Sequence, residues 1–209
     1  MPPFPLPFLR MILPIPPRSR VEPAPAHTDS ARAPESAVSL PVDFDSRAFR
    51  DTLGSFATGV TVVTARTASG ERIGLTVSSF NSVSLDPPLI LWSLAATSPN
   101  LEAFRCASHY AVNVLASGQQ ALSNRFAARE GDRFAGLAVC DGLGGAPLLP
   151  GCCAWFECVN THQYPGGDHL ILVGRVARFS RGEETDPLVF HGGRYRQLEI
   201  VFDAAANGN

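Results

Sequence analysis

The succession of short strand-like runs with little chain between them is the feature that most limits the fold of this sequence. Residues 60–65 are rich in β-branched side chains, which favour strands, and residues 72–80 follow after a turn signal at Ser69 and Gly70. A connection this short suits an antiparallel hairpin, whereas a parallel crossover needs a dozen or more residues. The sequence therefore favours an antiparallel sheet over a doubly wound fold.

Further strands are predicted at residues 89–94, 109–115, 152–161 and 169–179. The last two are joined by residues 164–168, a segment rich in turn-forming residues. Many short strands in close succession favour a closed antiparallel barrel, because closure removes exposed sheet edges.

Three short helices are predicted to flank this barrel. The first covers residues 46–56, with Ser46 as the expected N-cap and an apolar stripe formed by Phe49, Leu53 and Phe56. Ser98, as a cap, and Pro99, at the first helical position, predict the start of the second helix. Residues 119–128 predict the third, with Leu122 and Phe126 on one side.

The N-terminal segment has a composition that cannot pack. Eleven of the 18 prolines fall within residues 1–41, which show no helical or strand periodicity. Prolines and Arg10 also interrupt the apolar run that a secretory signal needs. We predict a disordered Pro-rich extension over residues 1–43, a folded domain over 44–203 and a flexible end over 204–209.

Charge and hydropathy exclude two classes of partner. Lys and Arg total 17 against 19 Asp and Glu, so a net charge of -2 provides no basic surface for nucleic acid. The longest apolar stretches, such as residues 87–96, are far shorter than the roughly 20 residues of a membrane-spanning helix. We expect a soluble protein.

The five cysteines form an odd set without a CxxC pair, which indicates a reducing cytoplasm. Cys152, Cys153 and Cys158 lie close together, upstream of His162 and His169, so a metal site has to be considered. Adjacent side chains of a strand face opposite ways, however, and do not easily bind one tetrahedral ion. We expect buried thiols and no metal.

The segment over residues 74–84 is the most unusual in the chain. It contains neither of the usual nucleotide-binding motifs, GxGxxG or GxxxxGK[ST], and neither does the rest of the sequence. Thr76, Ser78, Ser82 and Ser84 instead offer uncharged hydroxyls, which suit the edge of a flat polar heterocycle. A strand with one solvated face has the same composition, so both interpretations stay open here.

Two other positions suggest ligand contacts. The predicted helix start at Ser98 and Asn100 would present unpaired N–H groups to an anion such as a phosphate, with Arg125 as a charged partner. An ordinary cap and a surface arginine are the alternative. His169 follows the flexible residues 166–168, where it serves either a ligand or the cap of that turn.

Taken together, these segments resemble the flavin reductase components of two-component flavin-dependent monooxygenases. The resemblance runs in one register over about residues 46–198. It is carried by residues 49–64, 74–89, 98–100, 111–115, 125–126, 167–169 and 187–195.

The resemblance implies a mainly β fold with flanking helices, an FMN-binding split β-barrel of the Greek-key antiparallel type, which dimerises and binds flavin near the subunit interface. It implies isoalloxazine contacts at Gly74, Leu75, Thr76, Ser78 and Ser79, and a ribityl wall at Ser93, Leu94 and Ala95. The phosphate end is expected at Pro99, Asn100, Arg125 and Phe126, and the nicotinamide side at His169, Phe190, His191 and Tyr195.

The activity implied is that of an NAD(P)H:flavin oxidoreductase, which transfers hydride to FMN or FAD and supplies reduced flavin to a separate monooxygenase. His169 is the candidate catalytic residue, because a histidine can orient the nicotinamide amide or stabilise developing charge.

Two other functions are compatible with such a barrel. An enzyme of the pyridoxamine-phosphate-oxidase type would need a cluster of basic residues for a second phosphate, and none stands out in the sequence. A flavin-storing barrel without nicotinamide turnover is the non-enzymatic alternative. FMN or FAD, and NADH or NADPH, stay open.

Overall fold

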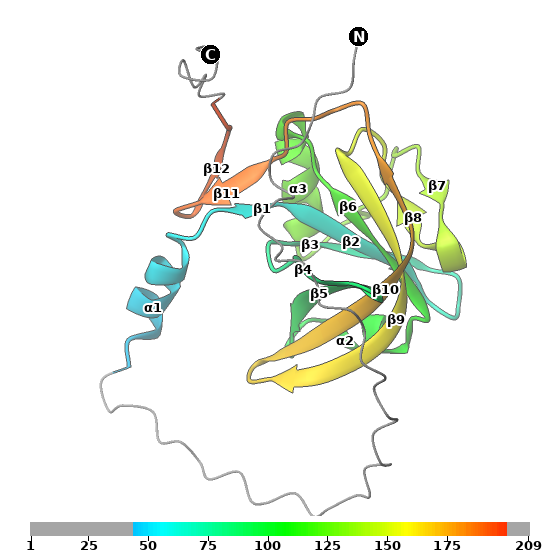
Figure 1. Ribbon diagram of the computed structural model, residues 1–209, viewed down its shortest axis with the longest axis horizontal. Helices are drawn as coiled ribbons and strands as arrows, with labels where there is room; N and C mark the ends of the chain where they lie inside the picture. The colour runs from blue at the N-terminus through cyan, green and yellow to red at the C-terminus, as the bar shows by residue number, and fades with distance from the viewer. Residues whose placement is uncertain (1–43, 200–209) are drawn as a thin grey trace, which may run out of the picture. The chain divides into compact units, whose positions relative to one another are not determined.

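The structure is a computed structural model, which describes residues 44–199. The expectations for residues 1–43 and 204–209 lie outside the described residues. The main element is a seven-stranded antiparallel sheet with the order β3-β2-β6-β9-β10-β5-β4 (Figure 1). Its strands are β2 (Thr61–Arg66), β3 (Arg72–Val77), β4 (Asn81–Leu85), β5 (Pro88–Ala95), β6 (His109–Val114), β9 (Ala154–Gly166) and β10 (His169–Arg181).

Smaller elements surround this sheet. A three-stranded sheet contains β1 (Thr58–Gly59), β11 (Val189–His191) and β12 (Arg194–Arg196), and a two-stranded sheet contains β7 (Cys140–Asp141) and β8 (Pro147–Leu148). The α-helices are α1 (Ser46–Leu53), α2 (Leu101–Cys106) and α3 (Gln120–Ala127). Two 3-10 turns, η2 (Ser117–Gln119) and η3 (Leu143–Gly145), complete the elements of the described residues.

The seven strands wrap around one apolar core. Inward side chains from six of them, together with Phe104 of α2, form a single buried cluster. Trp92 is at its centre and makes edge-to-face contacts with Phe104 and Tyr110, with ring centroids 5.1 and 5.7 Å apart. The second buried cluster lies on the opposite side of β2 and contains Val62 and Phe126. Because β2 is buried on both faces, its sequence is a continuous β-branched run instead of an alternating one.

The barrel is split, which corrects the expectation of a closed one. β3 and β4 lie at the two ends of the sheet order and do not pair with each other. The predicted strand over residues 72–80 ends at Val77, and three residues carry the chain across the gap to Asn81. The two strands are thus close in the chain but are not joined by a ladder of backbone hydrogen bonds, so the barrel is open between them.

The structure corrects both predicted helix caps. The carboxylate of Asp45, not Ser46, caps α1 by accepting hydrogen bonds from the backbone N–H groups of Arg47 and Ala48 at 2.8 and 3.2 Å. The second helix begins at Leu101, three residues later than Ser98.

The β9–β10 connection is also tighter than predicted. β9 continues to Gly166, which pairs with His169, so only Gly167 and Asp168 form the turn. Gly167 has a φ of +68°, a left-handed conformation that glycine adopts without strain. The predicted β2–β3 hairpin is confirmed, and so is the third helix with Phe126 buried.

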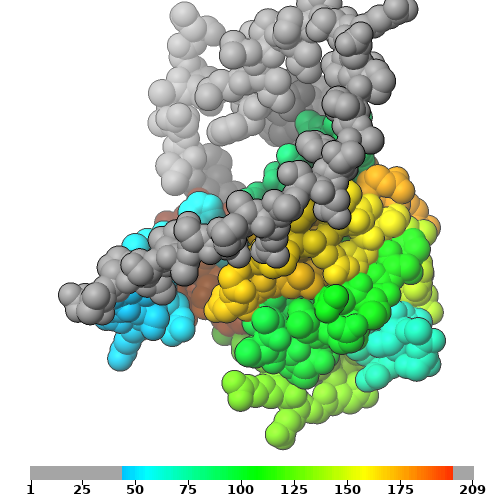
Figure 2. Space-filling model, turned by 90° about the horizontal axis from the view of Figure 1, so that it is seen from below, coloured from blue at the N-terminus to red at the C-terminus, as the bar shows by residue number. Residues whose placement is uncertain are grey.

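Side-chain amides of β9 hold α2 against the barrel. Asn160 Nδ2 donates to the carbonyl oxygens of Phe104 and Ala107, both at 3.0 Å, and Gln163 Nε2 donates to that of Arg105 at 2.9 Å. Figure 2 shows this hairpin, in yellow, beside the green surface of α2 and β6. These bonds attach the C-terminal part of α2 to β9.

The hydroxyl of Ser79 links the two sides of the split. Its Oγ donates to the carbonyl oxygen of Ser93 at 3.1 Å and accepts from the N–H of Ser93 at 2.9 Å. The Ser79 side chain thus takes the place of a pair of backbone hydrogen bonds between the β3–β4 connection and β5.

Replacing Ser79 with alanine removes both bonds and leaves the backbone of Ser93 without these partners. We expect the free energy of unfolding to fall by about 1–2 kcal/mol, because each such bond contributes roughly 1 kcal/mol. Denaturant titration measures this. Ser69→Ala, in an exposed turn, is the control and should change stability by less than about 0.5 kcal/mol. Equal stability of both variants would show that the bridge does not hold the split.

Candidate functional site

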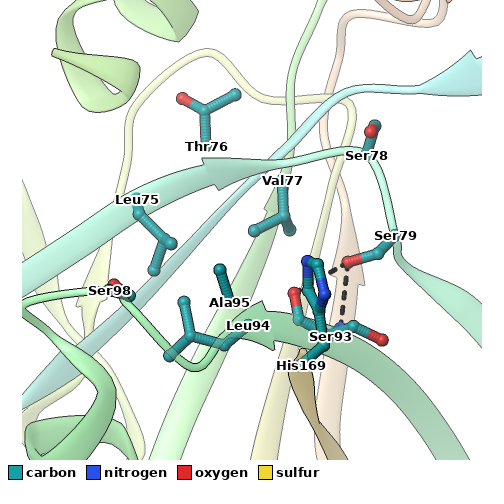
Figure 3. Close-up of a pocket in the computed structure, with 10 residues that line it drawn as sticks. All are labelled: Leu75, Thr76, Val77, Ser78, Ser79, Ser93, Leu94, Ala95, Ser98 and His169. Atoms are coloured by element: carbon teal, nitrogen blue, oxygen red, sulfur yellow. Dashed lines mark hydrogen bonds between the residues drawn. The ribbon is translucent and has the colours of Figure 1, made fainter. Parts of the chain in front are cut away.

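A cavity of about 380 Å³ lies at the split of the barrel. Figure 3 shows its ten lining residues, which come from β3, β5, the residues that follow each of these strands, and the start of β10. Seven are predicted flavin contacts and one is the predicted catalytic histidine: Leu75, Thr76, Ser78, Ser79, Ser93, Leu94, Ala95 and His169. Val77 and Ser98 complete the lining, and none of the ten is Lys, Arg, Asp or Glu.

The outer edge of β3 offers backbone groups to this region. In the antiparallel ladder with β2, residues alternate between those that bond to the partner strand and those that face away from it. The carbonyl oxygen of Gly74 faces outward, since it accepts from Arg133 Nη1 at 3.3 Å. Thr76 follows two residues later and has the same outward direction. The backbone N–H and C=O of Thr76 are therefore not hydrogen-bonded to β2 and are available to a ligand.

The hydroxyls of the groove act within the protein. Thr76 Oγ1 donates to the carbonyl oxygen of Ser123 at 2.7 Å, and Ser79 Oγ is bound to Ser93. Figure 3 shows the Thr76 side chain on the opposite side of β3 from Leu75 and Val77, as strand alternation requires. β3 therefore presents a ligand mainly with the backbone groups of its outer edge and with apolar side chains.

A second cavity, of about 200 Å³, shares Thr76, Val77 and Ser78 with the first. It brings the predicted Phe190 and Tyr195 to this region. Its other members, which the sequence reasoning missed, are Val60, Ser123 and Ala127. The two cavities therefore adjoin along the end of β3.

A third cavity, of about 260 Å³, lies at the other end of β3 and contains the predicted Gly74 and Asn100. Arg133 also lines it and was not predicted. Its guanidinium is held by the carbonyl oxygen of Ala128, at 2.6 and 3.2 Å, besides that of Gly74. The signal available in the sequence was the charged run over residues 129–133, which follows Arg125 closely.

Four predicted residues line none of these three cavities: Pro99, Arg125, Phe126 and His191. Arg125 is exposed at the end of α3 and donates to the carbonyl oxygen of Ala135 at 3.0 Å. Phe126 is 1% exposed and packs under Gly74, where an added Cβ would lie 2.8 Å from its ring. The Phe126 side chain therefore supports the groove from below.

His169 is oriented by its neighbour. Its Nδ1 lies 2.7 Å from Oδ1 of Asp168, and this hydrogen bond is the main cause that lowers the pKa of the Asp168 carboxyl. The carboxylate accepts, so Nδ1 carries a proton and Nε2 is the nitrogen left for another partner. The pairing is present above the ordinary pKa of aspartate and is lost as the pH falls through the lowered one. Both side chains are well exposed, so the pair adds little to stability.

No group of three or more His, Cys, Asp or Glu side chains within residues 44–199 has the arrangement of a metal site. Cys152 and Cys158 are buried, and burial raises the pKa of each thiol to about 12. They are inert apolar side chains at neutral pH. Nor does this part of the chain contain a helix long and apolar enough to cross a membrane.

Comparison with known proteins gives this geometry a context. FMN reductase (NADH) SmoA of Agrobacterium fabrum is 46% identical over 167 residues, 80% of this chain and 94% of that protein. The reductase component of the flavin-dependent trigonelline monooxygenase of Acinetobacter baylyi is 48% identical over 134 residues, 64% of this chain but 43% of that longer protein.

Among solved structures, an NADH:FAD oxidoreductase of Streptomyces globisporus, in complex with NAD and FAD fragments, superposes with a TM-score of 0.72. It is 36% identical, and the match covers 79% of this chain and all of that one. The family described as flavin reductase like domain matches residues 53–199, which include all three cavities. The chain therefore belongs to the flavin reductase like domain family.

Proposed function

We propose that this protein is an NAD(P)H:flavin oxidoreductase, which reduces FMN or FAD and releases the product to a separate monooxygenase. The observation that carries the proposal is the uncharged cavity at the split, with a second cavity sharing its wall along β3. Two flat rings that exchange a hydride need adjoining sites of this kind. The names of the relatives agree with this activity.

The larger cavity fits the isoalloxazine and ribityl parts of a flavin. Its polar groups are the outward backbone of Thr76, the hydroxyl of Ser78 and the nearby Ser98, all neutral, as suits an uncharged ring edge. Ser93 and Ala95 form the opposite wall. Arg133 and Asn100 at the third cavity, with Arg125 close by in sequence, are the candidates for the phosphate end.

The second cavity is the proposed nicotinamide site. When bound, the flavin takes up the hydride that the nicotinamide donates, so the cofactors supply the chemistry. The protein stacks and orients the rings and keeps water from them. Phe190 and Tyr195, whose ring centroids are 5.5 Å apart, form the aromatic wall of this cavity.

His169 lines the larger cavity and not the second one, and we propose that from there it orients the carboxamide of a nicotinamide stacked against the flavin. With Nδ1 protonated and held by Asp168, a neutral ring presents Nε2 as an acceptor, which matches the N–H₂ group of the nicotinamide amide. We assign it no role as an acid or base in hydride transfer, because the transfer requires none.

The decisive experiment is an assay of NADH and NADPH oxidation by dialysed protein, crossed with added FMN and FAD. We expect no turnover without added flavin and saturable turnover with it, because the groove has few charged anchors and lets the reduced flavin leave. A protein that retains flavin through dialysis and does not oxidise either nucleotide faster when flavin is added is a storage barrel, not a reductase.

Replacing His169 with alanine should lower kcat/KM for the nicotinamide about tenfold, the effect of one lost hydrogen bond. The Kd for flavin, measured by fluorescence titration, should stay within about twofold. His162→Ala, an exposed histidine on β9, is the matched control. If flavin binding weakens while single-turnover hydride transfer stays normal, His169 belongs to the flavin site instead.

A homodimer is part of the proposal. Leu85 and Phe179 are 82% and 76% exposed in the single chain and line an apolar hollow of about 360 Å³ with Phe80, Leu89 and Phe156. Large exposed side chains clustered in this way indicate a covered surface. A second copy of the chain would cover this hollow and the exposed apolar stripe of α1.

We expect a native mass of twice the 22.3 kDa chain, measured by light scattering during gel filtration. Phe179→Glu should yield monomers, because a carboxylate cannot be buried unpaired in an apolar interface. Ser180→Glu is the control, since the neighbouring side chain of a strand faces the other way. Dimers of both variants would place the interface elsewhere.

The cell compartment and the domain limits complete the proposal. All five cysteines are unpaired, which supports a cytoplasmic location. The family match over residues 53–199 supports a folded domain within the predicted 44–203.

A further inference from the structure

The β11–β12 hairpin forms one wall of the second cavity but is not part of the main sheet. It belongs to the separate sheet with β1 (Figure 1) and contributes Phe190 and Tyr195 to the cavity. The opposite wall comes from β3 and α3. The width of this cavity therefore depends on what holds β12 to α3.

A chain of hydrogen bonds through the Tyr195 hydroxyl makes that connection. The phenol donates its proton to Oδ1 of Asn124 at 2.8 Å. Its oxygen also lies 2.9 Å from Oγ of Ser123. A phenol has one proton, so Ser123 must be the donor to Tyr195.

The same chain continues to the groove. Ser123 is completely buried, and its carbonyl oxygen accepts the hydroxyl of Thr76 at 2.7 Å. Thr76 lines both cavities. Bonds through Tyr195, Ser123 and Thr76 thus join β12, α3 and β3, the three elements that surround the proposed nicotinamide site.

We propose that the Tyr195 hydroxyl is a positioning group, which sets the spacing of the nicotinamide cavity through Ser123 and Asn124 without touching the substrate. The proposal rests on the proposed function. The proton of the phenol is already donated to Asn124, so the hydroxyl has none to offer a nicotinamide carboxamide. Its ring still forms the cavity wall.

The experiment is a double-mutant cycle of Tyr195→Phe and Ser123→Ala, because both remove the same link from opposite ends. We expect each single variant to raise KM for the nicotinamide about fivefold, and the double variant to raise it no further. The Kd for flavin should stay within about twofold. Tyr164→Phe, which removes an exposed phenol hydroxyl on β9, is the control and should match the unaltered protein.

The melting temperatures of the variants distinguish a positioning role of the Tyr195 hydroxyl from a role in stability alone. Tyr195→Phe leaves the buried Ser123 hydroxyl without its acceptor, and this lowers the melting temperature, whereas the double variant has no such group and should recover part of the loss. If KM for the nicotinamide also recovers in the double variant, together with the melting temperature, the Tyr195–Ser123 hydrogen bond is only structural and the proposal is wrong.

Two other results would overturn it. If Ser123→Ala leaves KM unchanged while Tyr195→Phe raises it, the phenol contacts the substrate directly. If the unaltered protein oxidises NADH in a flavin-dependent manner and every variant does so with the same KM, the positioning role alone fails. Absence of flavin-dependent oxidation in the unaltered protein would refute the proposed function as well.

Discussion

The unpaired outer edge of β3 is the constraint on which the binding region depends. An antiparallel ladder leaves every second residue of an end strand with free backbone groups, and such an edge is exposed to wrong pairing unless it is covered. Here the connection from β3 to β4 turns the strand away after Val77. Ser79 then ties that connection to Ser93 of β5, so the edge lines a cavity of fixed width.

The close packing of α3 on β3 is the second determinant. Gly74 has no side chain, and its place is filled by the Phe126 ring, which any Cβ at that position would meet at 2.8 Å. This contact brings Ser123 within hydrogen-bond distance of Thr76. One face of β3 therefore supports a helix while its edge remains available to a ligand.

The electrostatics of the region suit the proposed chemistry. The cavity at the split is lined by no Lys, Arg, Asp or Glu side chain, so no permanently charged group there holds a substrate. The cavity at the far end of β3 is charged: Arg72 and Arg133 line it together with Glu71 and Asp132, and Arg133 is the proposed partner of an anionic group there. Hydride transfer between two bound rings requires orientation more than acid–base catalysis, and an uncharged groove with charged ends provides it.

The sequence by itself determined the strands of the main sheet other than β4, together with the β2–β3 hairpin, because periodicity, turn residues and β-branched runs are local signals. The resemblance to a family supplied the split barrel and the positions of the candidate contacts. Only the tertiary structure decided where the barrel opens, that Asp45 caps α1, and that Arg133 and Ser123 lie at the site. It also showed that the hydroxyls of Thr76 and Ser79 bond within the protein. These features depend on the distance between segments far apart in the chain, such as Ser79 and Ser93 or Ser123 and Tyr195, which no local pattern encodes.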